Sequence, residues 1–170
     1  MRLQRLIFFV SLSLALPASS FAGGTSGQTG IGFLVTDIST SLNLRIWSSE
    51  NMTIEPTFSF SRIFPKNSGS LASYQMGLGI AAHWKPGEDL RPYIGGRISF
   101  DIASFNDETY ADIAFSPVFG AEYFFSDHFS VGGEFQVIFV FTDDTFSPAL
   151  LATNATYIQP AQALTVQLYF

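Results

Sequence analysis

The sequence has no cysteine, few charges and no long hydrophobic helix, and each absence excludes a class of protein. With no Cys among 170 residues, neither a disulfide framework nor a lipid-bearing cysteine behind a leader is available. Charged residues make up 13% of the chain, well below the usual ~25%. The 14 acidic and 8 basic residues leave a net charge of −6, which argues against a nucleic-acid partner.

The start of the chain has the features of a secretory signal peptide. Two arginines precede an apolar run at 6–16, and a small-x-small cleavage site, Ser20-Phe21-Ala22, follows. The apolar run is shorter than the about 20 residues that a membrane-spanning helix needs. We therefore expect export by the Sec pathway and cleavage of a signal peptide over 1–22, which leaves one domain over 23–170.

The chain is rich in aromatic residues, and its apolar residues recur at every second position. Aromatic residues make up 16% of the chain, including 19 Phe. Over 52–61, apolar residues occupy the even positions, and Thr, Glu and Ser occupy the odd positions. A period of two places alternate residues on opposite faces of a β-strand. Eight segments alternate in this way, the first of them weakly: 28–38, 41–48, 52–64, 72–84, 90–101, 110–125, 128–141 and 157–170.

The connections between these segments alternate between short polar turns and longer loops. The short turns are 48–51, 85–89 and 126–127, and the longer loops are 64–71, 102–109 and 142–156. This is the arrangement of an outer-membrane barrel, whose short turns face the periplasm.

The less apolar side of each segment carries small residues instead of the Lys and Glu of a water-exposed surface. Gly77, Gly79, Gly95, Gly120 and Gly132 lie on this side. Small side chains fit the interior of a narrow eight-stranded barrel. The predicted fold is therefore all-β: a closed, up-and-down antiparallel transmembrane β-barrel of eight strands, with its apolar side in lipid. Closure is required, because lipid offers a sheet edge no hydrogen-bond partner.

Two prolines, Pro56 and Pro117, fall in the middle of predicted strands. Each lacks a backbone N–H, and a closed barrel has no edge strand to tolerate the loss. A β-bulge is one device that accommodates such a residue, but the sequence does not show how these two are accommodated.

Three turns with their flanking strands, at 45–51, 84–96 and 122–134, resemble the bacterial outer-membrane β-barrel domain family. That family includes small eight-stranded barrels of the OmpA and OmpX type. The resemblance covers most of the mature chain and implies insertion into the outer membrane of a Gram-negative bacterium. It also implies that a terminal Phe after alternating apolar residues is read by the barrel-assembly machinery. The matching residues are Leu164, Val166, Leu168 and Phe170.

Five charged residues on the predicted lumen side form the best candidate site. Arg45 and Glu55 flank one tight turn. Glu122 and Glu134 flank another, and Arg97 lies on the strand beside Glu122. We expect Arg97 to bridge Glu122 and Glu134, because two neighbouring carboxylates repel and a planar guanidinium can bind both. A structural plug is the favoured interpretation, and a gated pore or proton path is the alternative.

A catalytic interpretation is weaker. His128 and Ser130, followed by Glu134, are similar to the His-x-Ser pair and glutamate of an outer-membrane lipid A deacylase. The rest of that enzyme's motif is absent, and the pair falls at the predicted periplasmic end. His83 is expected to be a hydrogen-bonded lumen residue, since no His/Cys cluster has metal-binding spacing. We therefore expect no enzyme, no cofactor and no metal.

Aromatic residues near the strand ends are expected to form interfacial girdles. They are Tyr74, Trp84, Phe100, Tyr110, Tyr123, Phe125, Phe129, Phe141 and Phe170.

The sequence thus predicts a small integral outer-membrane barrel with a side-chain-filled lumen and a structural or surface-interaction role. A narrow solute pore, a lipid-modifying enzyme and a soluble periplasmic binding barrel are the alternatives. The expected partners are outer-membrane lipid, lipopolysaccharide and, during insertion, the barrel-assembly machinery. We expect a monomer that binds no nucleic acid.

Overall fold

A computed structural model describes residues 24–36, 39–63, 71–84, 89–105, 108–142 and 156–170. The described residues form eight β-strands and contain no helix long and apolar enough to cross a membrane. The strands are β1 (Thr29–Thr36), β2 (Thr40–Ser49), β3 (Met52–Ile63), β4 (Leu71–His83), β5 (Leu90–Phe105), β6 (Glu108–Ser126), β7 (Phe129–Thr142) and β8 (Thr156–Tyr169). The predicted signal peptide, 1–22, lies outside the described residues.

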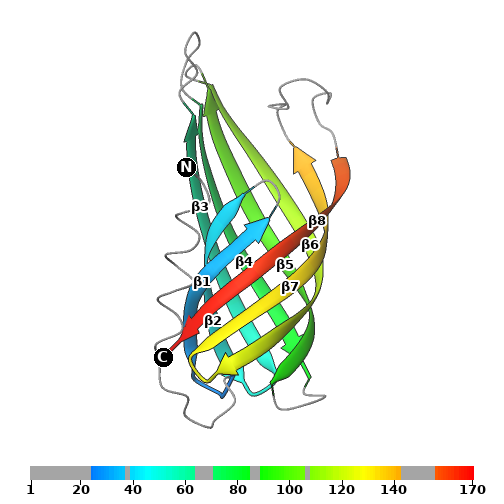
Figure 1. Cartoon of the computed structure of the whole chain (residues 1–170). Coiled ribbons are helices and arrows are strands. Elements are labelled where there is room, and N and C mark those ends of the chain that lie inside the picture. The colour runs from blue at the N-terminus through cyan, green and yellow to red at the C-terminus, as the bar shows by residue number, and fades with distance from the viewer. Residues whose placement is uncertain (1–23, 37–38, 64–70, 85–88, 106–107, 143–155) are drawn as a thin grey trace.

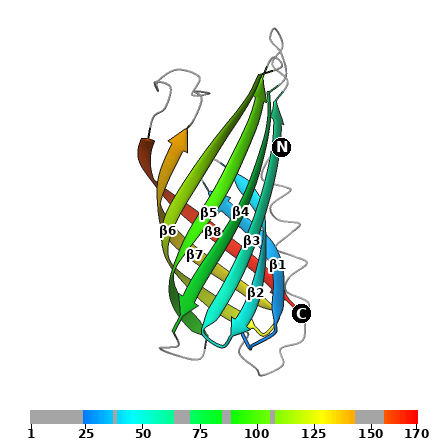
Figure 2. The ribbon, with the colours of Figure 1, turned by 180° about the vertical axis from the view of Figure 1, so that it is seen from behind.

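Each strand pairs with its neighbours in the sequence, and β8 pairs with β1 to close the barrel (Figures 1 and 2). Every pairing is antiparallel. The prediction of an eight-stranded, closed, up-and-down barrel is therefore confirmed.

Paired residues followed once around the barrel return to β8 at a different height. The path runs through Val166, Phe33, Leu42, Phe58, Met76, Phe100, Ile113, Phe141 and Thr156. It ends ten residues (166 − 156) further toward the end of the barrel that carries the longer loops. Such a stagger in eight strands goes with a strand tilt of about 35–45° and an interior that side chains fill.

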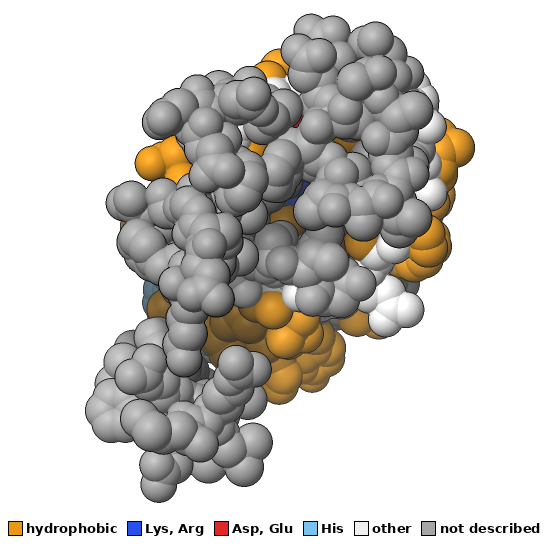
Figure 3. Space-filling view, turned by 90° about the horizontal axis from the view of Figure 1, so that it is seen from above, with side chains coloured by type: hydrophobic (Ala, Val, Ile, Leu, Met, Phe, Trp, Pro, Cys, Tyr) orange, Lys and Arg blue, Asp and Glu red, His pale blue; other side chains and the backbone are white. Residues whose placement is uncertain are grey.

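Side chains alternate between the two sides of the barrel wall as the sequence predicts. Large apolar residues point outward and are exposed on every strand, among them Phe33, Phe60, Met76, Phe119 and Ile158. We call this outward apolar surface the apolar belt; seen from above, hydrophobic side chains lie around the outside of the barrel (Figure 3). Most buried side chains longer than alanine are polar, charged or aromatic. The molecule is therefore inverted relative to a water-soluble protein, because its buried side is its polar side.

One predicted connection is wrong. A loop is predicted over 102–109, but β5 continues to Phe105 and β6 already begins at Glu108. The two strands stay paired as far as Phe105↔Glu108. This part of the hairpin lies beyond most of the apolar belt, so its residues do not show the apolar alternation by which strands are recognised. The other predicted segments agree closely with the observed strands.

The structure accommodates both prolines without β-bulges, a point that the sequence leaves open. β2 and β3 keep one register on both sides of Pro56, and their ladder is interrupted only beside the proline. On its other side, Pro56 pairs with Leu78 of β4 without interruption. Pro117 interrupts the β6–β7 ladder in the same way and stays paired with Gly96 of β5. The register shifts lie next to the tight turns after β2 and β6 instead.

Candidate functional site in the barrel lumen

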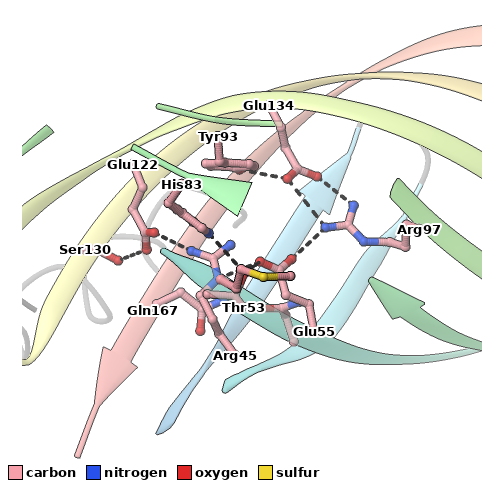
Figure 4. A network of polar contacts seen from close by, with 12 residues as sticks. Arg45, Thr53, Glu55, His83, Tyr93, Arg97, Glu122, Ser130, Glu134 and Gln167 are labelled. Carbon is pink, nitrogen blue, oxygen red and sulfur yellow. Dashed lines mark hydrogen bonds and ion pairs between the residues drawn. The ribbon is translucent and has the colours of Figure 1, made fainter. Parts of the chain in front are cut away.

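The five charged residues singled out from the sequence all point into the lumen and are buried (Figure 4). Arg45 lies on β2, Glu55 on β3, Arg97 on β5, Glu122 on β6 and Glu134 on β7. Because the apolar side of each strand faces outward, its polar alternate positions must share the interior. Strands distant in the sequence therefore bring their charges together at the barrel axis.

These residues form one chain of ion pairs in the order Glu122, Arg45, Glu55, Arg97, Glu134. Arg45 lies 2.9 Å from Glu55 through Nε and 2.5 Å from Glu122 through Nη1. Arg97 lies 3.0 Å from Glu55 through Nη2 and 2.8 Å from Glu134 through Nη1. The expectation that Arg97 bridges Glu122 and Glu134 is therefore wrong, because its second partner is Glu55. Because the strands are staggered, Arg97 reaches Glu55 on β3, and Glu122 pairs with Arg45 instead.

Neutral donors complete the environment of the two terminal glutamates. The Tyr169 hydroxyl donates to Glu122 at 2.7 Å, and Ser130 donates to the same carboxylate. The Tyr93 hydroxyl donates to Glu134 at 2.8 Å. Each terminal carboxylate thus combines one arginine with one tyrosine, and hydrogen bonds to an ionised group are stronger than neutral ones. A buried charge network is stable only when its members are satisfied in this way.

His83 serves as a packed lumen residue. Its Nε2 lies 3.0 Å from the Thr53 hydroxyl, which also donates to Glu55 at 3.1 Å. The imidazole lies between two aromatic rings, with ring centroids 4.5 Å from Trp47 and 4.9 Å from Tyr93. Within the described residues there is no group of three His, Cys, Asp or Glu that could hold a metal.

A sixth charged residue, Arg91, closes the network at the end of the barrel that carries the tight turns. It lies between two aromatic rings, 5.1 Å from the Trp47 centroid and 4.8 Å from the Phe124 centroid. Its Nη1 donates to the Gly24 carbonyl at 2.9 Å, so the segment before β1 covers this end. With Arg91, the fully buried charges of the described lumen are three arginines and three glutamates, and two further acids, Asp101 and Asp112, are half-buried on the same side.

Sequence reasoning placed Arg91 on the lumen side without joining it to the network, and it missed Trp47 entirely. A signal existed for both, because Trp47 is in phase with Arg45 on β2 and Arg91 is in phase with Arg97 on β5. Trp47 is fully buried although it is aromatic. Phase along the strand, not residue type, decides the side.

Glycines on the inner wall make room for the large lumen side chains. A Cβ at Gly120 would lie 2.4 Å from Cζ of Tyr93, and one at Gly132 would lie 2.4 Å from Oγ1 of Thr165. These positions are close approaches that only glycine permits. The predicted small-residue side is thus the complement of the large polar side chains.

The three residues considered for catalysis are engaged with different partners. Ser130 donates to Glu122, and Glu134 accepts from Arg97 and Tyr93. Nδ1 of His128 donates to the Tyr169 carbonyl at 3.1 Å. The arrangement gives no Ser–His hydrogen bond of the kind that activates a nucleophile among these residues.

The lumen beside the network is filled. Beside Arg97, the buried side chains of Ala81, Tyr93 and Val118 pack against one another. Chemically, the arrangement can hold strands together and block passage.

The predicted girdle residues point outward where the structure describes them. Exposed on the outer wall are Tyr74, Trp84, Phe100, Tyr123, Phe125, Phe141 and Phe170. Phe129 is half-buried, and the side chain of Tyr110 lies outside the described residues. On β8 and just beyond it, Leu164, Leu168 and Phe170 are exposed and Val166 is half-buried on the same side. Recognition of these four by the barrel-assembly machinery stays a prediction.

No family model matches the chain, and no curated protein matches it. Among solved structures, the fold is similar to that of the outer membrane protein OprG from Pseudomonas aeruginosa, with a TM-score of 0.50 and 11% identity over 89% of this chain and 99% of OprG. Neisserial surface protein A aligns with a TM-score of 0.49 and 12% identity over 84% of this chain and 92% of its own. The N-terminal β-barrel domain of OprF from Pseudomonas aeruginosa aligns with a TM-score of 0.48 and 13% identity over 85% of this chain and 98% of that domain. The likeness to OprG shows that the chain has the fold of a small outer-membrane barrel.

Proposed function

We propose that the chain is an integral protein of the bacterial outer membrane, with a plugged lumen and a structural or surface-interaction role. The observation that carries the proposal is the inversion of polarity across the barrel wall. A continuous belt of exposed Phe, Leu and Ile surrounds the barrel, while arginines and glutamates fill its interior. Such a belt is stable in acyl chains and would drive association in water.

The outer-membrane location also follows from the combination of fold and predicted signal peptide. Where each strand of the closed barrel is paired on both sides, its backbone groups bond one another and need no water. The tight turns after β2 and β6 mark the periplasmic end, which places the longer loops at the cell surface. Lipid and lipopolysaccharide are then its immediate partners, and the barrel inserts as a monomer.

The ion-pair chain favours a plug over a narrow solute pore. Arg45 and Arg97 each contact two glutamates on different strands, so the chain of side chains crosses the lumen. A solute would have to separate buried, hydrogen-bonded charges, which is costly without replacement partners.

An enzymatic role and a soluble binding role have less support. A lipid-modifying enzyme would need Ser130 beside a base and near lipid, whereas Ser130 is buried in the lumen against Glu122. A soluble periplasmic binder would need its Phe-rich side inside, and that side faces out.

Two measurements on the wild-type protein test the proposal. Cell fractionation with heat-modifiable gel mobility should place the protein in the outer membrane and show a compact form that converts on boiling. Planar-bilayer recording should show no channel events above those of an empty bilayer. A soluble protein with unchanged mobility would overturn the membrane location, and steady single-channel conductance would overturn the plug. A lipid A mass spectrum altered by expression and restored by Ser130→Ala would favour the enzyme.

A further inference from the structure

The outer rim of the barrel has a low point at the β1–β2 hairpin. β1 ends at Thr36, which pairs with Ala163, while β8 continues outward from there to Thr156. Figure 1 shows the end of this hairpin below the ends of β3 and β8 on either side. The barrel wall is therefore shorter at this hairpin than around the rest of its circumference.

The apolar belt is also shorter here. Its last exposed apolar residue is Val35 on β1, whereas on β8 it continues to Ile158. Val35 pairs with Leu164, six residues along β8 from Ile158. At about 3.3 Å per residue and a tilt of about 40°, the belt ends roughly 10–15 Å lower at the hairpin. Half of a bilayer's hydrocarbon core is about 15 Å, so this step is comparable to one leaflet.

Above Val35, at the height where the apolar belt is missing, the described side chains are polar. We call Thr36, Ser39, Thr40 and Gln162 the hairpin-end patch. Thr40 and Gln162 are exposed on the outer surface. Thr36 and Ser39 bond each other, with the Ser39 N–H donating to Thr36 Oγ1 at 2.9 Å. The described side chains of the patch offer hydroxyls and an amide.

The edge of β8 adds unpaired backbone to this patch. Among the described residues, none pairs with Thr156–Gln162 on the side of β1. Phe170 bonds Thr29 through both its N–H and its C=O, so even-numbered residues of β8 face this side. Residues 158, 160 and 162 therefore point their backbone groups toward the open edge. Acyl chains cannot satisfy such groups.

A strand from another protein fits this edge poorly. Pro160 lies in the middle of it and has no N–H to donate, and a proline on an edge strand blocks strand addition. Water and lipid headgroups can bond the same carbonyls, hydroxyls and amide without that requirement.

We propose that the β1–β2 hairpin end is a recess in the apolar belt that draws outer-leaflet lipid headgroups and their water below the surrounding membrane surface. This inference rests on the proposed membrane location. The shortened hydrophobic wall thins the leaflet locally, as hydrophobic mismatch requires. The ligand class is a hydrated lipid headgroup region, since the described residues of the patch bear hydrogen-bonding groups.

The test compares two outward positions at one height. The path of paired residues described above, from Val166 to Thr156, rises by about ten residues over eight strands. Phe100 lies three strands along this path from Leu42, so it is about four residues higher than Leu42. Thr40 is two residues above Leu42, which places Ile98 on β5 at the height of Thr40. Ile98 is exposed within the apolar belt.

The chain has no cysteine, so single-cysteine variants report one site each. Thr40→Cys and Ile98→Cys are folded into phosphatidylcholine vesicles, and a membrane-impermeant maleimide is supplied on both sides. Gel mobility confirms folding, and Gln162→Cys replaces Thr40→Cys if the latter does not fold. We expect labelling at residue 40 to be at least about tenfold faster than at residue 98.

The outcomes separate the two proposals. If both cysteines are protected, the recess does not exist, and the membrane location stands. If both react rapidly, the belt is in water, and the membrane location itself is wrong. Fast reaction at residue 40 alone supports the recess.

Discussion

At the scale of single residues, Tyr93 reaches Glu134 only because its neighbour at position 120 has no side chain. The Tyr93 ring occupies the space where a Cβ of residue 120 would be. Close packing of this kind leaves little freedom for the interior to rearrange. The lumen is therefore specified by pairs of one large polar residue and one glycine on adjacent strands.

Gly120→Ala should destabilise the barrel by about 1–3 kcal/mol, the usual range for overpacking a filled interior. The new methyl group would displace Tyr93 and lengthen its 2.8 Å hydrogen bond to Glu134. Urea unfolding in lipid vesicles, followed by gel mobility, measures the change. Gly133→Ala is the matched control, since a Cβ there meets nothing within 4 Å. Equal stability of the two variants would contradict this account of the interior.

Arg97→Ala should lower the unfolding free energy by about 3–5 kcal/mol, the range found when one partner of a buried ion pair is removed. Glu55 and Glu134 each lose a charged partner in this variant. The same unfolding assay gives the stability, and bilayer recording should still show no channel. A clear gain in conductance would mean that Arg97 acts as a gate.

At the scale of elements, a proline leaves the inward–outward alternation of side chains unchanged but interrupts the backbone hydrogen bonds to a neighbouring strand. The side chains around Pro56 keep their phase on β3, but the β2–β3 pairing is interrupted beside it. Pro160 on β8 has its nitrogen on the open edge, where no described strand lies. The two prolines therefore differ in whether their missing N–H removes a hydrogen bond.

The unfolding free energy of Pro56→Val should exceed that of Pro160→Val by about 1 kcal/mol, which is the net value of one hydrogen bond. Only the first substitution gives β2 a new N–H donor. Each variant removes one proline, so the unfolded chain gains the same conformational freedom in both. The difference between their unfolding free energies therefore isolates the hydrogen bond. Thermal unfolding of both proteins in one detergent provides the comparison, and a reversed order would show that Pro56 costs the ladder nothing.

At the scale of the whole molecule, the barrel is defined by which solvent meets each side of its wall. The outer wall is apolar, while the described lumen buries three arginines and three glutamates. A positive charge on the outer wall should therefore be tolerated only where water or headgroups reach it.

Phe119→Arg, midway along the outward residues of β6, should cost about 2–4 kcal/mol in a bilayer. Phe125→Arg lies at the periplasmic end of the same strand and should cost at most about 1 kcal/mol, because Arg can extend to the interface. Both Phe side chains are exposed on the outer wall. Unfolding titrations in vesicles measure both, and equal costs would place the two sites at the same depth.

The alternation of residues determined most of the architecture. It gave the strand number, the closure and the side of each charge, because a period of two is a local property that the chain carries without its neighbours. It failed at 102–109, where β5 and β6 continue beyond the belt and no apolar side is required. It also left Trp47 unassigned, although its phase with Arg45 on β2 places it on the lumen side.

Beyond the Arg45–Glu55 pair, whose two residues flank one tight turn, the partners of the charges were decided only by the closed tertiary structure. Arg97 and Glu122 lie on adjacent strands, yet Arg97 bonds Glu55 and Glu134. Which side chains meet across the lumen depends on the stagger accumulated around all eight strands, a quantity that no single segment encodes. The low rim at β1–β2 is likewise a difference in height between strands, and it exists only once the first and last strands have joined.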